Sequence, residues 1–272
     1  MPSVGRYMGA KIFGGGRSKE VNYVVVLFDQ ASGEVAAFVD GHVLTAYRTA
    51  ATSAVAVDRL APAGPAALAV LGSGLEASNH VHAISTVRTL SRVSVFSPTT
   101  VNRQAFAKSV TDSLGIPCQS FDSAEKAVQG ATIVVAAARS LDESPILHGK
   151  WLEHGMMIVS IGSTVPEQRE IAADVIEQSD LIVCDVVDEV VHETGDMIAA
   201  RDAGIAFTGK IISLDTAMSR DSDMRIQSAR QPLFKSVGSA LQDVAAAELV
   251  LDLAIADGSA QPLPIQFLAK KT

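Results

Sequence analysis

Residues 66–77 carry the pattern that most restricts the fold of this chain, because a buried strand runs straight into a glycine-rich turn. The apolar run 66–71 is followed by Gly72-Ser73-Gly74-Leu75-Glu76-Ala77, and a helical pattern continues over 77–90. Glycines often only turn a chain, but a strand, this turn and a helix together are what the phosphates of a dinucleotide require. The first glycine allows the tight turn, the second lets the backbone approach a pyrophosphate, and the alanine lets helix and strand pack closely. The helix N-terminus adds N–H groups for phosphate oxygens, so the sequence predicts a dinucleotide site here.

From residue 63 onward, short apolar runs alternate with helical patterns, which is typical of a parallel sheet covered on both faces. Strands are predicted at 67–71, 92–96, 132–138, 156–161 and 181–185, and helices at 77–90, 99–114, 123–128 and 168–178. The fold class is therefore α/β, with a doubly wound Rossmann domain over residues 63–212.

The two ends of the chain have a different pattern. Strands are predicted at 8–13, 21–29 and 34–39, and long helices at 43–60 and 236–256. We expect residues 1–62 and 213–272 to form one smaller α+β domain for substrate binding and dimerisation, into which the Rossmann domain is inserted.

Composition excludes several classes of protein. The formal net charge is −8 and no basic run occurs, which argues against nucleic acid as a partner. The two cysteines, Cys118 and Cys184, are far apart and are expected to be buried thiols, and the six histidines lack a metal-ligand spacing, so no metal is expected. The N-terminus has no apolar segment of a secretory signal, and no run approaches the ~18 residues of a membrane span, so we expect a cytoplasmic protein.

Five motifs, in order, resemble the ornithine cyclodeaminase/mu-crystallin family of nicotinamide-dependent enzymes. They are Gly9-Ala10-Lys11-Ile12; Asp40-Gly41 with 44–51; 72–77; 161–170; and Leu233-Phe234-Lys235-Ser236-Val237-Gly238 with Gln242-Asp243. The resemblance implies a homodimer that pairs through its smaller domain, with the active site in the cleft between domains. It also implies that an N-terminal segment of typical members is missing here.

Three residues are candidates for the chemistry on the substrate. Arg48 has small neighbours, and its planar fork suits a carboxylate, although a surface arginine is the alternative. Lys11 lies in a predicted strand, where a solvated edge charge is the alternative; the resemblance places it at the substrate carboxylate or the reacting nitrogen. Thr164 stands where members that deaminate ornithine carry an aspartate, and a threonine hydroxyl is a poor general base.

The end of the second Rossmann strand bears on the cofactor. An NAD site usually has an acidic residue there, but Ser97-Pro98-Thr99-Thr100 and Arg103 occupy the place. These residues favour NADP(H), with NAD(H) as the alternative; Thr99 as a plain helix cap and Arg103 as a solvated charge are the competing interpretation. Glu76 is expected to point away from the phosphates, and Glu193–Asp196 is interpreted as a loop or helix terminus. Further cofactor contacts are assigned to Ala137, Ala138, Gly162, Ser163, Lys235, Ser236 and Val237, the last three opening the final helix, where the resemblance places the nicotinamide.

The leading hypothesis is an NADP(H)-preferring reductase of a small α-imino acid, with cyclic ketimines such as 1-pyrroline-2-carboxylate as the type case. Reduction of a protonated C=N bond needs mainly hydride delivery and an oriented carboxylate. An amino acid dehydrogenase is the second hypothesis, and ornithine cyclodeaminase ranks third because of Thr164. A crystallin-like protein that binds NADP(H) without turnover is the alternative from another class.

Overall fold

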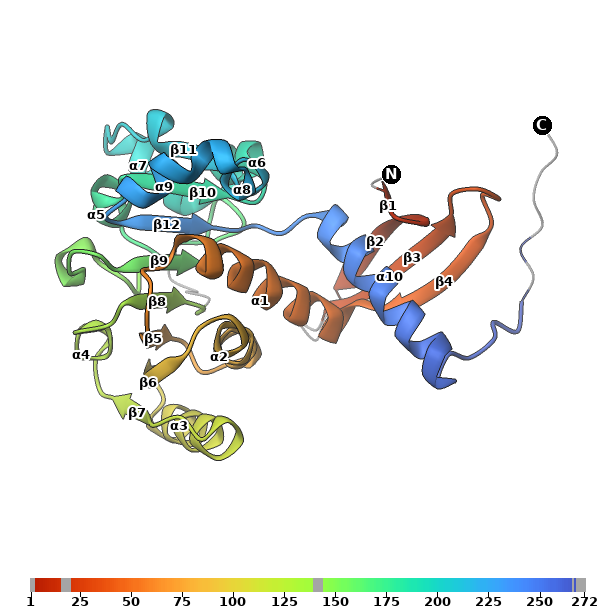
Figure 1. The fold of residues 1–272 in the computed structure, drawn as a ribbon, viewed down its shortest axis with the longest axis horizontal. Coiled ribbons are helices and arrows are strands. Elements are labelled where there is room, and N and C mark those ends of the chain that lie inside the picture. The colour runs from red at the N-terminus through yellow and green to blue at the C-terminus, as the bar shows by residue number, and fades with distance from the viewer. Residues whose placement is uncertain (1–2, 16–20, 139–143, 266, 268–272) are drawn as a thin grey trace. The chain divides into compact units, whose positions relative to one another are not determined.

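The computed structural model describes residues 3–15, 21–138, 144–265 and 267 of the 272-residue chain (Figure 1). It divides into two compact units, a smaller one of residues 1–49 with 238–272 and a larger one of residues 50–237. The boundaries expected at 63 and 212 therefore both fall inside the larger unit. Residues 50–60 join it because Ala56, Val57 and Leu60 pack in its core, and residues 213–237 join it because they supply a strand inside its sheet.

The larger unit contains an eight-stranded sheet in the order β11-β10-β12-β9-β8-β5-β6-β7, and every pair of neighbours is parallel. The five predicted strands are confirmed, and β7, β11 and β12 are additional. β7 and β11 are too short or too polar to stand out, and β12 follows a polar stretch. The strands are β5 (Ala66–Leu71), β6 (Leu90–Phe96), β7 (Cys118–Phe121), β8 (Ile133–Ala136), β9 (Met157–Ser160), β10 (Leu181–Cys184), β11 (Ile211–Ser213) and β12 (Pro232–Lys235).

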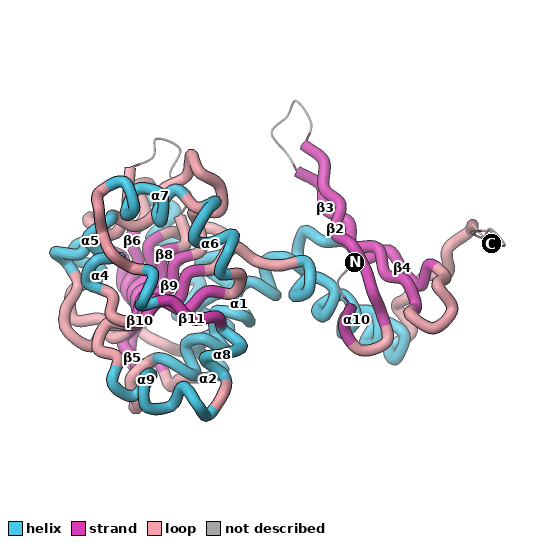
Figure 2. The backbone as a smooth tube through the Cα atoms, turned by 90° about the horizontal axis from the view of Figure 1, so that it is seen from above, coloured by secondary structure: helices cyan, strands magenta, loops and turns pink. Residues whose placement is uncertain are grey.

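Helices cover both faces of this sheet, as Figure 2 shows for the magenta strands and cyan helices. Alternate residues of each strand serve opposite faces: Leu68 and Val70 pack in one hydrophobic cluster, and Ala69 and Leu71 in another. The first cluster receives α1 (Gly41–Leu60), α2 (Leu75–Val87), α3 (Thr100–Leu114), α8 (Leu214–Met218) and α9 (Asp223–Ser228). The second receives α4 (Ala124–Val128), α5 (Ala173–Gln178), α6 (Val187–Glu193) and α7 (Gly195–Asp202). Short 3₁₀ turns lie at Gly149–Trp151, Thr208–Lys210 and Arg220–Ser222.

The strand order reverses between β5 and β8, because the chain runs from β5 outward to β7 and then returns to the other side of β5. In open parallel sheets the crevice at such a switch point, beyond the carboxyl ends of the strands, is where ligands bind. The turn 72–77 follows β5 directly, so the fold places the predicted dinucleotide turn at this point.

Two predicted helices begin later than expected. The helix predicted from 168 begins at Ala173, because the N–H groups of Glu170 and Ile171 bond to Asp196 and that of Ala172 bonds to Leu147. The helix predicted from 236 is α10 (Ala240–Asp257), with Ser239 as its N-cap. Lys235 ends β12 instead, so residues 235–237 do not open a helix.

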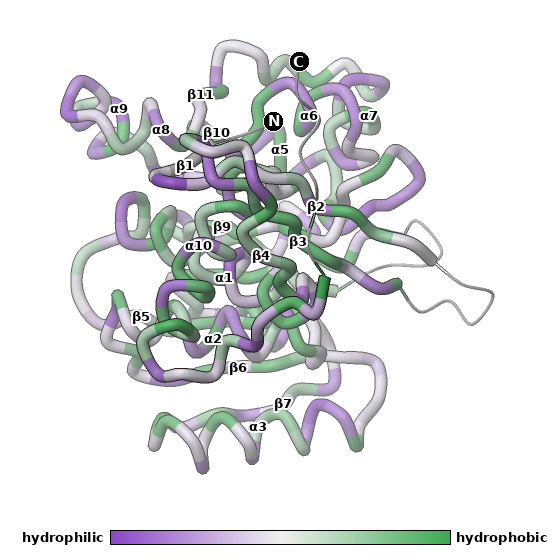
Figure 3. The backbone as a smooth tube through the Cα atoms, turned by 90° about the vertical axis from the view of Figure 1, so that its right-hand side faces the viewer, coloured by the Kyte–Doolittle hydropathy of each residue, from purple (hydrophilic) through white to green (hydrophobic). Residues whose placement is uncertain are grey.

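The smaller unit is an antiparallel sheet in the order β1-β2-β3-β4, packed against α10. Its strands are β1 (Ser3–Val4), β2 (Tyr7–Gly15), β3 (Val21–Asp29) and β4 (Val35–Asp40). Val25 and Leu27 of β3 pack on Val244 and Ala247 of α10. Figure 3 shows the hydrophobic colour along β3, β4 and α10. Within the described ranges no helix is long and apolar enough to cross a membrane.

Candidate functional site

The glycine turn after β5 has the geometry that its sequence predicts. Gly72 has a φ of +130°, and a Cβ there would lie 2.4 Å from the carbonyl oxygen of Ala137, so only glycine fits. Gly74 is the N-cap residue of α2, no side chain caps this helix, and a Cβ at Gly74 would meet nothing within 4 Å. Ala77 is fully buried in the helix–strand contact. The turn thus leaves an open approach to an uncapped helix N-terminus, which fits a pyrophosphate.

The end of β6 is tied to this turn. The hydroxyl of Ser73 donates to that of buried Ser97 at 2.9 Å. Arg103 donates from one nitrogen to the carbonyl oxygens of Ser97 and Pro98, at 3.1 and 3.2 Å, so it braces this loop. Thr99 is the N-cap residue of α3, but its hydroxyl makes no capping hydrogen bond. The structure therefore gathers the predicted residues beside the switch point, and no carboxylate stands at positions 97–100.

The buried carboxylate of Glu170 holds the loops that follow β8 and β9. One oxygen accepts from the N–H of Ala138 at 3.1 Å. The other accepts from the Ser160 hydroxyl at 2.7 Å and from the N–H groups of Ile161 and Gly162 at 2.9 and 2.8 Å. Burial raises the pKa of Glu170 to about 7, whereas the Lys235 ammonium and the Ser160 hydroxyl lower it. Glu170 was not predicted as a site residue.

Lys235 is fully buried and lies 3.0–3.1 Å from the Ser160 hydroxyl, the carbonyl oxygen of Ser163 and a carboxylate oxygen of Asp196. Asp196 is also fully buried, and its other oxygen accepts from the N–H groups of Glu170 and Ile171. The segment 193–196 is the helix terminus that the sequence predicts, because α6 ends at Glu193 and α7 begins at Gly195, and its aspartate is in addition part of a buried ion pair.

The remaining predicted residues of the larger unit have separate surroundings. Ser236 and Val237 donate to the carboxylate of Asp185, at 2.7 and 3.1 Å, so the loop after β12 is fixed to the end of β10. Thr164 is exposed, and its hydroxyl donates to the side-chain oxygen of Gln168 at 3.3 Å. Glu76 lies with its carboxylate 4.0 Å from the ring of buried His80.

In the smaller unit the structure brings Lys11 and Arg48 onto one carboxylate. An oxygen of Asp243, on α10, lies 3.0 Å from Nε of Arg48 and 3.4 Å from Nζ of Lys11. All three side chains are at most 12 % exposed. Lys11 also donates to the Thr45 hydroxyl at 2.7 Å. Two cations thus converge in a largely buried place, and such a pair suits an anionic ligand.

Gly238 gives Arg48 its room. It has a φ of +82°, and a Cβ there would lie 2.5 Å from a guanidinium nitrogen. Asp243 and Gly238 were recognised only as parts of a motif. Both residues contact Arg48 in the structure but lie about two hundred positions from it in the sequence, so no local sequence pattern could have shown the contact.

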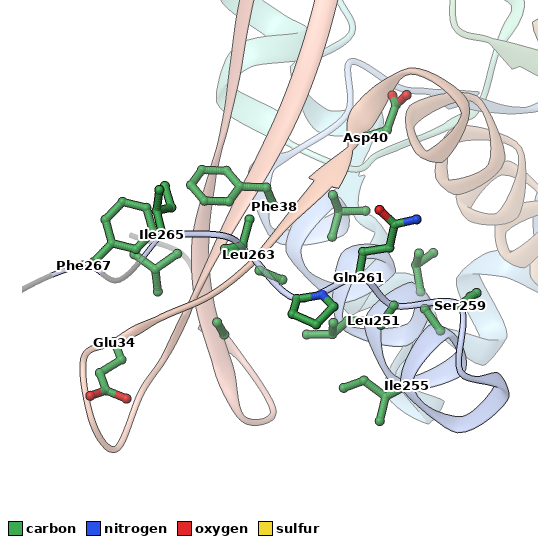
Figure 4. Close-up of a pocket in the computed structure, with 18 of the residues that line it drawn as sticks. Glu34, Phe38, Asp40, Leu251, Ile255, Ser259, Gln261, Leu263, Ile265 and Phe267 are labelled. Atoms are coloured by element: carbon green, nitrogen blue, oxygen red, sulfur yellow. The ribbon is translucent and has the colours of Figure 1, made fainter.

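A separate hollow of about 910 Å³ lies in the smaller unit between β4, α10 and residues 259–265 with 267 (Figure 4). Phe38, Leu251, Ile255 and Leu263 are among its apolar lining residues. It contains neither Lys11 nor Arg48. Among the described residues, no three His, Cys, Asp or Glu side chains are grouped as a metal ion would need.

Comparison with known proteins agrees with the motifs. The family model described as the ornithine cyclodeaminase/mu-crystallin family matches residues 11–258. Ketimine reductase mu-crystallin of Rattus norvegicus is 32 % identical over 84 % of this chain and 68 % of its own length. A Delta(1)-pyrroline-2-carboxylate reductase of Bacillus cereus is 30 % identical over 88 % of this chain and 73 % of its own.

Two solved structures extend the comparison. Thermococcus litoralis Delta(1)-pyrroline-2-carboxylate reductase, in complex with NADH and L-proline, has a TM-score of 0.78 at 27 % identity and covers 88 % of this chain and 73 % of its own. The iminosuccinate reductase of Paracoccus denitrificans, in complex with NAD+, has a TM-score of 0.86 at 26 % identity and covers 96 % and 80 %. With a family model matched over most of its length and relatives of this similarity, the chain belongs to the ornithine cyclodeaminase/mu-crystallin family.

Proposed function

We propose that this protein is an NAD(P)H-dependent reductase of the C=N bond of small α-imino acids, with cyclic ketimines such as 1-pyrroline-2-carboxylate as the substrate class. The observation that carries the proposal is that two largely buried cations, Arg48 and Lys11, converge on the carboxylate of Asp243. A substrate carboxylate would be a suitable further ligand for this pair of cations. The names of the relatives, ketimine reductase and pyrroline-2-carboxylate reductase, support the same reaction.

The proposed roles follow from the two groups of residues. The larger unit would hold the cofactor through the turn 72–77, the loop Ser97–Arg103 and the loops of Ala137–Ala138 and Gly162–Ser163. A bound reduced nicotinamide supplies a hydride for the imine carbon. Arg48 would fix the substrate carboxylate through its planar fork, and Lys11 would add a second positive charge beside it.

The position of Thr164 favours reduction over cyclodeamination. The imine substrate is already protonated at nitrogen, so hydride addition gives the amine without a base. Cyclodeamination instead requires deprotonation of an amine and loss of ammonia, and the Thr164 hydroxyl is a poor base for that. The amino acid dehydrogenase alternative differs in requiring free ammonia and a 2-oxo acid.

The decisive assay follows loss of reduced-nicotinamide absorbance with 1-pyrroline-2-carboxylate, with a 2-oxo acid alone, and with a 2-oxo acid plus ammonia. We expect turnover of the cyclic imine. Arg48→Lys should lower kcat/KM roughly 10- to 100-fold, the equivalent of about 1.5–3 kcal/mol for a hydrogen bond to a charged group. Arg6→Ala is the control, because Arg6 is an exposed arginine of the same unit. Turnover only with ammonia would indicate a dehydrogenase, and cofactor binding without any turnover would indicate a binding protein.

We further propose that NADP(H) is preferred. The support is the absence of a carboxylate at positions 97–100 and the presence of Arg103, whose charge would attract a 2′-phosphate. The relatives with bound cofactor hold NADH or NAD+, so a direct comparison of the two cofactors is needed.

We also propose a homodimer that pairs through the smaller unit. Its helix α10 exposes Leu249, Leu253 and Ile255 by 59–60 %, and large exposed apolar side chains on one helix suit a protein–protein interface. Light scattering should give twice the 28.4 kDa chain mass for the wild type and the monomer mass for Leu253→Glu.

A further inference from the structure

Four donors converge on the carboxylate of Glu170, and they come from two different loops. Its Oε1 receives the N–H of Ala138, in the loop after β8. Its Oε2 receives the N–H groups of Ile161 and Gly162 and the hydroxyl of Ser160, at the end of β9. β8 and β9 are neighbours in the sheet, so one buried side chain joins the loops at their carboxyl ends.

Two further charged groups fix Glu170 itself. The Asp196 carboxylate accepts from the backbone N–H of Glu170 at 2.7 Å, and the same aspartate pairs with Lys235. Lys235 in turn reaches the Ser160 hydroxyl and the carbonyl oxygen of Ser163, again in the loop after β9. Gly162 leaves the carboxylate its space, because a Cβ there would lie 2.2 Å from Oε1.

The location of these loops connects the network to the cofactor. The glycine turn after β5 would take the pyrophosphate, and the loop after β6 would take the adenosine side. A dinucleotide lies across the switch point, so its other end, the nicotinamide, extends over the loops after β8 and β9. Glu170 is fully buried and acts on these loops from beneath.

We propose that Glu170 is a positioning residue that sets Ala137–Ala138, which follow β8, and the loop after β9 for the nicotinamide half of the cofactor, with Asp196 and Lys235 as its supports. This inference rests on the proposed function. It gives the buried carboxylate a task in hydride transfer that is separate from acid–base chemistry, because all four of its contacts are donors and the anion accepts them.

Glu170→Gln changes this arrangement in a defined way. An amide nitrogen cannot accept a hydrogen bond, so the amide oxygen should keep the Oε2 position with its three donors, and the NH₂ group should face the N–H of Ala138. The variant should therefore release the loop after β8. Gly162→Ala is an independent second perturbation, because its methyl group displaces the same carboxylate. Glu167→Gln is the matched control, since Glu167 is an exposed glutamate of the same loop.

The experiment compares the affinities of NADH and ADP-ribose, which lacks the nicotinamide, and then measures kcat with 1-pyrroline-2-carboxylate. For Glu170→Gln and Gly162→Ala we expect NADH binding to weaken about tenfold, ADP-ribose binding to stay within twofold, and kcat to fall at least tenfold. Glu167→Gln should change none of these. The double variant should be no worse than the more impaired single variant, because both act through one carboxylate.

Two results would overturn the proposal. One is equal weakening of NADH and ADP-ribose, including complete loss of both in a variant, because the network would then support the fold and not the nicotinamide loops. The other is wild-type behaviour of both variants. Failure of the proposed function is a different outcome, since the wild-type protein itself would then not reduce the imine.

Discussion

Two alanine substitutions in the glycine turn should separate folding from cofactor binding. At Gly72 the φ of +130° is strained for any residue with a Cβ, at a cost of about 1–3 kcal/mol, and the new Cβ would lie 2.4 Å from the backbone of Ala137. At Gly74 the φ is −88° and a Cβ meets nothing within 4 Å. Gly74→Ala should therefore be free of strain, and the gain of about 0.4–1 kcal/mol through the unfolded chain should be offset by the poorer N-cap preference of alanine.

Both substitutions should impair the cofactor site, for different reasons. Urea unfolding followed by the fluorescence of Trp151, the single tryptophan, reports the larger unit. Gly72→Ala should lower the free energy of unfolding by at least about 2 kcal/mol, as strain and backbone clash add. Gly74→Ala should change that free energy by less than about 1 kcal/mol, yet weaken NADH binding at least about tenfold, or 1.4 kcal/mol, because its methyl group occupies the open approach to the helix N-terminus.

The contrast between the two variants makes the reasoning refutable. A Gly74→Ala protein that binds NADH like the wild type would show that the open side of the turn is not where the pyrophosphate lies. Wild-type stability of Gly72→Ala would contradict the steric argument itself.

Three further predictions concern other parts of the molecule. Burial lowers the pKa of His80 from 6.5 to about 4. As pH falls, this histidine therefore takes up its proton in the unfolded chain before it does so in the folded protein. Its contribution to the free energy of unfolding should drop by about 2 kcal/mol between pH 8 and pH 5. The difference between wild type and His80→Gln in urea titrations measures that loss, with the oppositely acting Glu170 present in both proteins; parallel titrations would contradict it. Gly238→Ala should push the guanidinium of Arg48 off its partners and raise the KM for the imino acid at least about tenfold, with NADH affinity unchanged. Arg103→Gln should lower the ratio of NADPH to NADH affinity by roughly tenfold, as expected for loss of a charged contact to the 2′-phosphate, and an unchanged ratio would remove the argument for NADP(H).

Most of the strands in the larger unit could be predicted from local patterns of apolar residues in the sequence. Four of the five predicted strands are continuous apolar runs, as expected for strands buried on both faces, and the fifth, 92–96, alternates apolar and polar residues. β12 could not be found in this way, since it begins with a proline and ends with a lysine, and its place between β9 and β10 depends on distant strands. Because β12 was not predicted, the boundary predicted at residue 212 differs from the end of the larger unit at residue 237.

Some residues of the candidate site could also be predicted from the sequence, and others could not. Gly72, Gly74 and Arg48 were predicted because a turn or a residue type has a direct chemical meaning. Glu170 and Asp196 were missed because their partners, the N–H groups of other loops, have no signature in a sequence. A buried carboxylate is costly unless donors surround it, so the contacts that reveal its role exist only after folding.

Four buried or partly buried carboxylates near the predicted site residues bind groups of the protein itself. Around the carboxyl ends of the strands, Asp185, Glu170 and Asp196 each accept backbone N–H groups, and in the smaller unit Asp243 pairs with two cations. Each of these carboxylates thus binds the protein's own groups. A reductase of a protonated imine needs positive charge for the substrate and fixed loops for the cofactor, and no free base. The internal contacts of these four acids are therefore compatible with the proposed reaction.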